Sequence, residues 1–240
     1  MQISLIIPMY NEASIIADTL QTLSTYMAKN FESFEILFSD DGSTDGCGDI
    51  VRQAALPSVF VTGYEQNRGK GCAVRTAMLE AKGDFVMFTD ADLAYGTDVI
   101  RQAYDLWEAE GHPDLLLGSR NLGDNGYEGY TWLRRVMSKA YIKILCLAGG
   151  FRRSDSQCGC KGFSQKAAKD IFSRCRVDGF AFDFEAILWA EQLGLRVEEM
   201  PVRIIRHRES KIHILRDTFR MLRDLRRIRK EVKRSARNEQ

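Results

Sequence analysis

The sequence of 240 residues contains no long uninterrupted hydrophobic run. A helix that spans a bilayer needs about 20 predominantly apolar residues, whereas the best candidate here, residues 141–151, is shorter and includes Lys143. The first residues lead straight into an expected strand, without the basic region that opens a secretory signal peptide. We therefore expect a cytoplasmic protein whose contact with any membrane is peripheral.

Cysteine is too dispersed for a disulfide scaffold or a zinc site. The six cysteines form no paired CxxC motif. Cys158 and Cys160 are the nearest to a soft-metal pair, but no second cysteine or histidine pair accompanies them. We expect reduced thiols that serve packing. The four prolines and the lack of repeats or low-complexity stretches give no sign of a flexible linker.

Two common phosphate-binding motifs are also missing. Residues 67–71, Asn-Arg-Gly-Lys-Gly, lack the upstream glycine spacing and the final Ser or Thr of a P-loop. The turn after the first expected strand, residues 8–12, is Pro-Met-Tyr-Asn-Glu and holds no GxGxxG fingerprint. The sequence therefore argues against a P-loop kinase and against a dinucleotide-dependent dehydrogenase.

What is present is an alternation of short β-rich runs with segments of helical period. The expected strands are residues 3–9, 35–39, 59–63, 84–88 and 114–118. Repeated strand-helix alternation predicts right-handed crossovers and a mainly parallel α/β sheet covered by helices on both faces. We expect one domain over residues 1–210, with a nucleotide-binding half (1–120) and an acceptor half (121–210).

The acceptor half has a different pattern from the first half. We expect a long helix near residues 130–147, a loop over residues 149–162 and a further helix near residues 184–193. In the first half, Asn11 is a possible N-cap of the first helix, and Asp45 is better explained as a helix cap than as a ligand.

Acidic residues follow two of the expected strands. Asp90 and Asp92 stand one residue apart after the apolar run 85–88, and a second acidic turn, residues 40–45, follows the run 35–38. In an extended chain the first pair shares one face, where it can hold a hard divalent cation together with phosphate oxygens. Such pairs also occur in solvated turns. Because open α/β sheets bind ligands where strands end, the pattern favours a site for a divalent cation that bridges to a nucleotide phosphate.

Positive charge gathers near the C-terminus, although the formal net charge is only +1. Residues 211–237 hold eleven Lys or Arg against three acidic residues. Apolar residues recur there at three- and four-residue steps, so residues 211–240 are expected to form a basic amphipathic helical extension. It can lie on an anionic membrane surface, or dock on the body with its basic face in solvent. Aromatic residues are too few there for us to expect a nucleic-acid partner.

Four ordered motifs in the first half resemble the inverting glycosyltransferases of family two, which have the GT-A fold. They are residues 7–12, 40–45, 67–71 and 90–92. The resemblance extends through four motifs of the second half and covers about residues 3–225. Those further motifs are residues 118–120, 134–138, 155–161 and 182–185.

The full set of motifs is similar to the polyprenyl-phosphate sugar synthases, especially the dolichyl-phosphate β-glucosyltransferases. Mannosyl-phosphate synthases of this group usually carry a Gln two residues after the second metal Asp, whereas this chain has Leu93-Ala94-Tyr95. The resemblance therefore implies a hexosyltransferase that uses UDP-glucose rather than GDP-mannose. It also implies peripheral attachment to the cytoplasmic face of a membrane, since the N-terminal anchor of the eukaryotic enzymes is not seen here.

The resemblance assigns roles in the nucleotide half. Asp90 and Asp92 would hold Mg²⁺ or Mn²⁺ on the donor diphosphate, and Asp92 is counted as catalytic. The residues expected around the nucleotide are Pro8, Tyr10, Glu12, Asp41, Lys70 and Asp90. Asp41 would accept a hydrogen bond from the base, although Pro8 and Tyr10 can also be explained as turn and packing residues.

The acceptor implied is a polyprenyl phosphate. A phosphate monoester, with a second pKa of about 6, is already an oxyanion near neutral pH, so it needs cations to place it rather than a protein base. Arg120 and Arg135 are expected to be catalytic. The full set expected at the acceptor phosphate is Arg120, Arg135, Ser138, Arg206 and Lys211.

Two other functions stay open at this point. A hydroxyl acceptor on a glycan, lipid or protein would require a base, for which Asp183 and Glu185 are the candidates. Asp155 and Gln157, in a glycine-flanked loop, are candidates for sugar contact or for a structural role. A non-enzymatic protein that binds nucleotides or nucleic acid is the remaining alternative, but it would leave the paired carboxylates unused.

Overall fold

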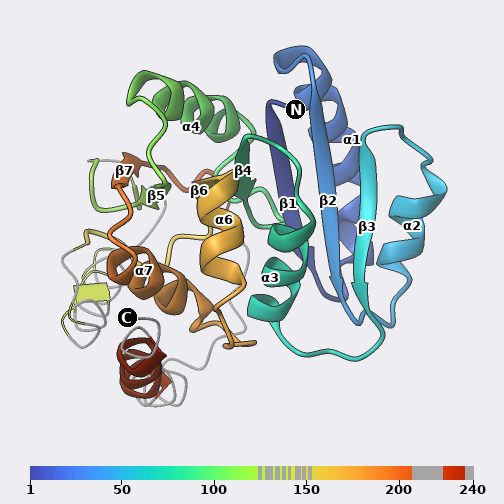
Figure 1. The fold of residues 1–240 in the computed structure, drawn as a ribbon. Coiled ribbons are helices and arrows are strands. Elements are labelled where there is room, and N and C mark those ends of the chain that lie inside the picture. Colours follow the sequence, from blue (N-terminus) through green and yellow to red (C-terminus); the bar gives the residue numbers. More distant parts are fainter. Residues whose placement is uncertain are drawn as a thin grey trace.

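The computed structural model describes residues 1–123, 126–127, 153–206 and 224–235, together with residues 132, 136, 139, 142, 143, 147 and 150. A seven-stranded sheet of order β3-β2-β1-β4-β6-β5-β7 forms the centre (Figure 1). The strands are β1 Ile3–Met9, β2 Phe34–Asp41, β3 Val59–Tyr64, β4 Phe85–Phe88, β5 Leu115–Ser119, β6 Lys161–Ser164 and β7 Val197–Pro201. All five expected strands are confirmed, to within two residues at each end.

The sheet is mainly parallel, as predicted, but one strand runs the other way. Strands β3, β2, β1 and β4 pair in parallel, and so do β5 and β7. Strand β6 pairs antiparallel with both β4 and β5. It begins at Lys161 and so occupies the end of the segment expected to be a loop. This insertion places Lys161 beside Phe88, at the end of β4.

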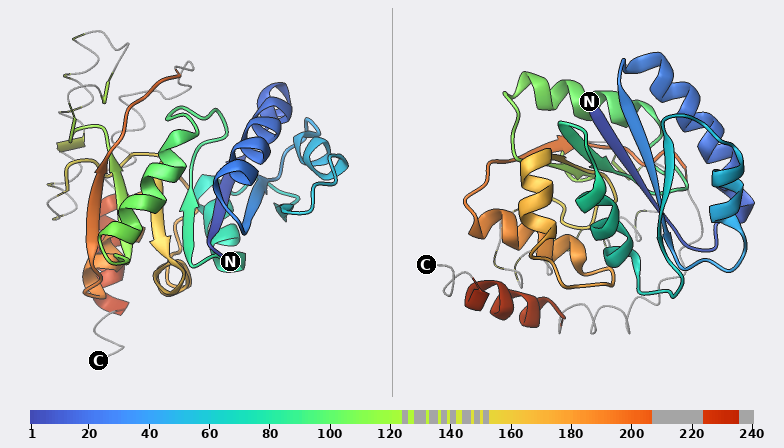
Figure 2. Two further views of the ribbon diagram at one scale, coloured as in Figure 1. Left: turned by 90° about the horizontal axis from the view of Figure 1, so that it is seen from above. Right: turned by 45° about the vertical axis from the view of Figure 1, so that its right-hand side comes forward.

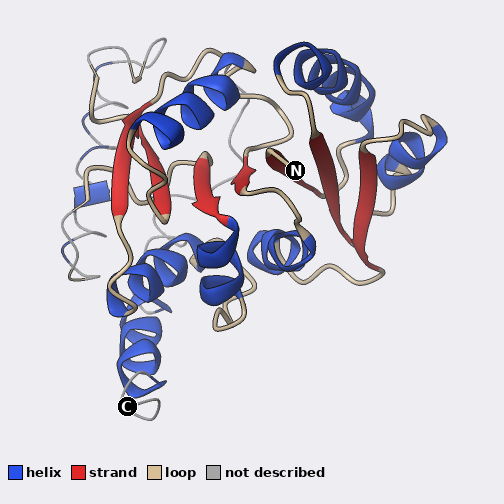
Figure 3. Cartoon of the chain, turned by 45° about the horizontal axis from the view of Figure 1, so that its top comes forward, coloured by secondary structure: helices blue, strands red, loops and turns tan. Residues whose placement is uncertain are grey.

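Helices cover both faces of the sheet (Figures 2 and 3). They are α1 Ala13–Asn30, α2 Cys47–Gln53, α3 Lys70–Glu80, α4 Asp98–Ala109, α6 Gln165–Phe172 and α7 Phe182–Gln192. Alternate residues of the strands divide the core, since Ile6 packs with α3, α6 and α7 while Leu5 and Ile7 pack with α1, α2 and α4. The expected helix near residues 184–193 is therefore confirmed as α7.

Residues 224–235 form a helix at the edge of this core. Its Leu225, Ile228 and Val232 are buried in the same cluster as α6 and α7. The rest of the predicted extension lies outside the described residues. No helix in the part of the chain that the structure describes is long and apolar enough to cross a bilayer.

Candidate functional site

The candidate site lies where β1, β2 and β4 end, because parallel strands bring their carboxyl ends to one edge of the sheet. Met9 pairs with Asp40 at the end of β1 and β2, and Asp41 pairs with Tyr64 at the end of β3. The loop after β4 carries the Asp90 and Asp92 pair. All the acidic turns expected from the sequence therefore open on the same side of the fold.

The Asp41 carboxylate is already surrounded by hydrogen-bond donors. It accepts from the Tyr64 hydroxyl at 2.6 Å, from the Asn67 amide at 2.8 Å and from the backbone N–H groups of Arg68 and Gly69 at 2.9 Å. Burial, together with the bond to Asp41, raises the pKa of Tyr64, so its hydroxyl stays a donor. Asp41 therefore fixes the loop between β3 and α3. The residue as a whole is only 4% exposed.

The paired carboxylates contact a cation of the chain itself. The Lys70 ammonium, at the start of α3, donates to the Asp90 carboxylate. Burial alone would lower the pKa of Lys70, but the carboxylates of Asp90, Asp183 and Asp92 outweigh it and raise that pKa. Asp92 accepts a hydrogen bond from the Ala94 N–H at 3.1 Å, which turns the loop after β4.

The donor set fits Mg²⁺ or Mn²⁺ only in part. No group of three or more His, Cys, Asp or Glu side chains with metal-site geometry occurs among the described residues. Asp90 and Asp92 would supply two carboxylates, and the Lys70 ammonium shows that a cation is stable at the first of them. Mg²⁺ is usually bound by one or two carboxylates with substrate phosphates and waters, so this pair suits a metal that arrives with a diphosphate.

The segment before β6 presses directly against this pair. A Cβ atom added to Gly159 would lie 2.1 Å from Oδ2 of Asp90, so only glycine allows this approach. The Gly159 N–H donates to the buried Tyr95 hydroxyl at 3.1 Å. Backbone from the second half of the chain therefore forms one wall of the carboxylate site.

Arg120 and Asp155 form a paired unit beside that wall. The Arg120 guanidinium donates to the two carboxylate oxygens of Asp155 at 2.7 and 3.1 Å, and Asp155 is fully buried. Burial opposes the charge on Arg120, but Asp155 outweighs it and raises the Arg120 pKa well above its usual value. Arg120 is thus held as a cation in a fixed orientation, and Asp155 takes two of its five N–H donors.

Gln157 adds a donor of a different kind. Its backbone N–H bonds to Asp155 at 3.0 Å, which orients the turn. Its side-chain Nε2 is buried without a hydrogen-bond partner among the described residues. A buried N–H group normally finds an acceptor, so this amide is suited to a ligand oxygen such as a sugar hydroxyl.

The two candidate bases are both engaged by the protein. Asp183, which is 7% exposed, accepts from the Lys161 ammonium at 2.5 Å, while burial raises its pKa. Glu185 accepts from the backbone N–H groups of Arg176 and Val177 at 2.7 to 2.9 Å, and is 3% exposed. The contacts of Glu185 orient the turn before α7, and both carboxylates are almost fully buried.

Comparison with known proteins decides the family. The model of the family described as "Glycosyl transferase family 2" matches residues 4–172. The chain belongs to glycosyl transferase family 2. Among solved structures, the glucosyl-3-phosphoglycerate synthase of Mycobacterium tuberculosis, in complex with Mn²⁺, UDP and glucosyl-3-phosphoglycerate, is similar with a TM-score of 0.70. At 18% identity over 95% of this chain and 79% of that one, the likeness shows the GT-A fold alone.

Relatives of this family 2 chain include two dolichyl-phosphate beta-glucosyltransferases. That of Dictyostelium discoideum is 29% identical over 95% of this chain and 73% of its own length. ALG5A of Trichomonas vaginalis is 29% identical over 83% of this chain, but this chain spans only 64% of its length. The uncharacterized protein MJ1222 of Methanocaldococcus jannaschii is 30% identical, over 85% and 82% of the two chains.

In the family 2 fold, the turn after β1 is tied to the second acidic turn. The Asn11 N–H donates to the Ser43 hydroxyl at 3.0 Å, and Asp45 accepts from the N–H groups of Ala13 and Cys47 at 2.8 and 3.1 Å. The Asp45 carboxylate therefore binds the first N–H group of α1 and of α2, in keeping with a capping role, although the N-cap residues themselves are Glu12 and Gly46. The N-cap of α1 is Glu12, so the expectation for Asn11 was wrong by one residue.

The three nucleotide candidates in this turn, Pro8, Tyr10 and Glu12, differ in exposure. Pro8 is buried within β1, whereas Tyr10 is 46% exposed and its ring is available to a ligand. Glu12 begins α1 with its carbonyl, which accepts from the N–H groups of Ile15 and Ile16. Pro8 therefore shapes the end of the strand, while Tyr10 is the candidate that a base could stack on.

The acceptor candidates of the family 2 chain are only partly described. Arg135, Ser138 and Lys211 lie outside the described residues. Arg206 is exposed, and its backbone N–H donates to the Ala94 carbonyl at 3.2 Å, two residues from Asp92. It lines a hollow of about 580 Å³ whose other lining residues are Thr22, Leu93, Tyr95, Gly96, Thr97, Asp98, Val99, Gln102, Gly123, Gly126, Pro201, Val202, Arg203 and Ile205.

Sequence reasoning overlooked two charged groups of this site. Lys161 is buried beside the carboxylates, and Asp178 binds Arg75 at 2.5 Å and Arg68 at 3.3 Å. Lys161 stands in a motif that already carried the family resemblance, so its place there was a usable signal. Nothing local marks Asp178, because its partners are more than a hundred residues away.

Proposed function

We propose that the chain is an inverting hexosyltransferase that moves glucose from UDP-glucose to a polyprenyl phosphate with the help of Mg²⁺ or Mn²⁺. The observation that carries this proposal is the pair of carboxylates at the end of β4, one of which already binds a cation, Lys70. The named activity of the two glucosyltransferase relatives supports the choice of substrates.

In the proposed reaction the chain positions groups that are already charged. The nucleotide would lie along the turns after β1, β2 and β3. Asp90 and Asp92 would hold the metal, which would supply positive charge against the negative charge of the leaving diphosphate. Arg120, whose orientation is fixed by Asp155, directs N–H groups at a phosphate oxygen.

The bonds exchanged balance without a proton transfer. An oxygen of the acceptor phosphate attacks the anomeric carbon from the face opposite the diphosphate, and the bond from that carbon to the diphosphate breaks. UDP leaves with the electron pair, so an α-linked donor gives a β-linked product. No protein base is needed, which agrees with the engagement of Asp183 and Glu185 by their own neighbours.

The proposal includes a location. The enzyme would work peripherally on the cytoplasmic face of a membrane, where the phosphate of the lipid acceptor can be reached without extracting its chain. The basic charge near the C-terminus supports attraction to an anionic membrane surface.

Nucleoside diphosphate release tests this function. UDP-glucose, UDP-galactose, UDP-N-acetylglucosamine and GDP-mannose are supplied in turn with Mn²⁺, with and without a short water-soluble polyprenyl phosphate. We expect release to be fastest with UDP-glucose and to require the lipid phosphate. Asp92→Ala serves as the blank, and the exposed Asp105→Ala is the matched control.

The result that would overturn the proposal is equally concrete. Metal-dependent release that ignores the lipid phosphate, but rises with a hydroxyl acceptor and is lost in Asp183→Asn, would assign the enzyme to hydroxyl acceptors instead.

A further inference from the structure

The helix at residues 224–235 turns its apolar side inward. Leu225, Ile228 and Val232 are 0%, 2% and 4% exposed and pack in the core. Side chains that are buried against α6 and α7 cannot enter a bilayer while the helix stays docked. Only its opposite side faces outward, and the exposed cations there are Arg226, Arg227, Lys230, Lys233 and Arg234.

A second set of exposed apolar side chains belongs to described residues between 132 and 147. Trp132, Val136 and Leu147 are helical and 77%, 44% and 69% exposed. With Lys139 and Lys143, which are also helical and exposed, they recur at steps of three and four residues, the spacing at which helical residues face the same way.

The burial of Ile142, the residue before Lys143, confirms which way these exposed side chains point. Ile142 is 2% exposed and packs in the core, whereas its neighbour Lys143 points outward. Residues one apart on a helix differ in direction by about 100°. Trp132, Val136 and Leu147 therefore face away from the core.

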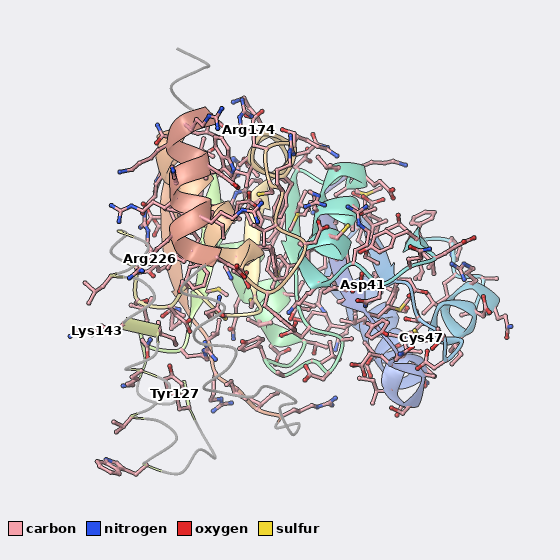
Figure 4. All side chains as sticks on the ribbon, turned by 90° about the horizontal axis from the view of Figure 1, so that it is seen from below. Asp41, Cys47, Tyr127, Lys143, Arg174 and Arg226 are labelled. Carbon is pink, nitrogen blue, oxygen red and sulfur yellow. The ribbon has the colours of Figure 1, made fainter. Side chains whose placement is uncertain are left out.

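The two exposed sides meet at Leu147. A hollow of about 540 Å³ is lined by Leu147 together with Arg226, Arg229, Lys230 and Lys233. Gly150 lies close to Arg229 of the C-terminal helix, because a Cβ atom added to Gly150 would be 2.8 Å from the Arg229 guanidinium. In Figure 4 the labelled Lys143 and Arg226 lie on one side of the molecule, away from Asp41 at the nucleotide turns.

The charge of this region has one sign over a long stretch. Residues 129–154 contain six Lys or Arg and no acidic residue. On the neighbouring helix Glu231 pairs with Arg227 at 2.9 Å, outside the hollow. Tryptophan with lysine or arginine is the composition that membrane interfaces favour, since the indole lies at headgroup depth while the cations meet anionic lipids.

We infer that this surface, made by Trp132, Val136, Lys139, Lys143 and Leu147 with the cations of residues 226–233, docks on an anionic lipid bilayer. The inference rests on the proposed function in one respect, because a lipid-linked acceptor requires the enzyme to reach a membrane. On this inference the C-terminal helix does not insert into the bilayer. The side that carries Trp132, Lys139 and Lys143 makes the contact instead, beside the exposed cations of the C-terminal helix.

Sedimentation with vesicles tests the surface, using the full chain. Vesicles of phosphatidylcholine with added phosphatidylserine, and without any polyprenyl phosphate, should bind the wild type, and binding should fall as salt is raised. Trp132→Ser with Leu147→Ser should weaken binding about tenfold or more, because interfacial affinity scales with the apolar area buried. The matched control is Leu56→Ser with Phe60→Ser, which removes comparable exposed apolar groups elsewhere.

The basic part is tested in the same assay. Arg226→Gln, Lys230→Gln and Lys233→Gln together should reduce binding to the anionic vesicles roughly tenfold, since polybasic surfaces owe their affinity to anionic lipid. The control removes the same charge from exposed residues elsewhere, Lys29→Gln, Arg52→Gln and Lys166→Gln. Equal binding by the two charge variants, or equal binding by the Trp132 variant and its control, would overturn the inference.

A measurement on the unmodified protein guards against variants that fail to fold. Lipid that carries bromine near the headgroup should quench tryptophan emission, because Trp107 and Trp189 are buried at 5% and 4% exposure and only Trp132 can meet the lipid. No quenching on bound vesicles, or displacement of the vesicles by a single-stranded RNA oligonucleotide that binds the same cations, would refute the bilayer as partner.

Failure of this surface is separable from failure of the proposed function. Turnover of the short water-soluble acceptor does not need a membrane, so the vesicle-binding variants should retain it. Lost vesicle binding with intact turnover supports the surface, whereas vesicle binding that survives every variant refutes it whatever the turnover.

Discussion

The Lys161 ammonium and the Asp183 carboxylate lie 2.5 Å apart beneath the candidate site, with side chains only 1% and 10% exposed. Lys161 also donates to the Cys158 carbonyl at 2.6 Å and lies 5.5 Å from the centre of the Phe88 ring. This buried pair joins the start of β6, the end of β4 and the start of α7, and Asp183 lies near enough to Asp90 for the charge of Asp90 to act on it.

Breaking the pair from one side should be costly. Lys161→Met leaves Asp183 buried without its counter-ion, and we expect the free energy of unfolding to fall by about 3–5 kcal/mol. Lys161→Met combined with Asp183→Leu removes both charges and should recover a large part of that loss. Urea unfolding of the single and double variants measures this difference. Additive losses would show that the two residues act independently.

The Lys70 ammonium binds Asp90, one of the two carboxylates that we propose hold a metal. Lys70→Met should therefore raise the affinity of the nucleotide-free protein for Mn²⁺ about tenfold, because the competing cation is gone. Titration of free Mn²⁺ by electron paramagnetic resonance reports this without any turnover. Lys29→Met, an exposed lysine on α1, is the control. Unchanged Mn²⁺ affinity in Lys70→Met would mean that the ammonium and the metal do not compete.

Gly159 should matter to the carboxylate site more than to the fold. A Cβ atom at residue 159 would meet Oδ2 of Asp90 at 2.1 Å, and the Asp90 side chain can rotate away at little cost to folding. We expect Gly159→Ala to weaken Mn²⁺ binding with UDP by about tenfold or more while the melting temperature changes little. Gly179→Ala, where nothing lies within 4 Å of the added atom, is the control. Equal metal binding by the two variants would contradict this prediction.

The ion pairs of Asp178 should make part of the free energy of unfolding depend on pH. Burial would raise the pKa of Asp178, but its hydrogen bond to Arg75 at 2.5 Å outweighs that effect and lowers the pKa below 3.8. A carboxylate with a lowered pKa stabilises the fold above its unfolded pKa, and this contribution is lost as the pH falls through the folded one. The free energy of unfolding of the wild type should exceed that of Asp178→Asn at neutral pH, and the difference should shrink below about pH 4.

Urea unfolding between neutral pH and pH 3 would follow that loss. Asp170→Asn, at a more exposed carboxylate on α6, is a suitable control. If the difference in the free energy of unfolding between the wild type and Asp178→Asn stays constant down to pH 3, the ion pair with Arg75 makes no pH-dependent contribution to stability.

Local pattern was enough for the first half of the fold and for its acidic turns. The runs that became β1, β2 and β4 are apolar enough to be recognised as buried strands, and Asp90 and Asp92 stand where one of them ends. Strands β6 and β7 were not predicted. Lys161–Ser164 is four residues with a lysine and a glycine, and Val197–Pro201 contains two glutamates, so neither has a strand pattern of its own.

The roles of single site residues depended on distant partners. Asp155 was a candidate for sugar contact or for a structural role, and its carboxylate is taken by Arg120, 35 residues away. Glu185 was a candidate base, but two backbone N–H groups before α7 hold it. Neither pairing follows from periodicity or spacing, because both depend on how the segments around β6 and α7 pack.

The hydrogen bonds of Asp41 affect the entropy that binding of the proposed nucleotide donor would cost. The segment from Tyr64 to Gly69 is fastened to one carboxylate before any nucleotide arrives. The entropy of ordering it is therefore lost when the chain folds and need not be lost again at each catalytic cycle. In the proposed reaction a nucleotide would meet a rigid edge there, and its binding energy would remain available for orienting the sugar.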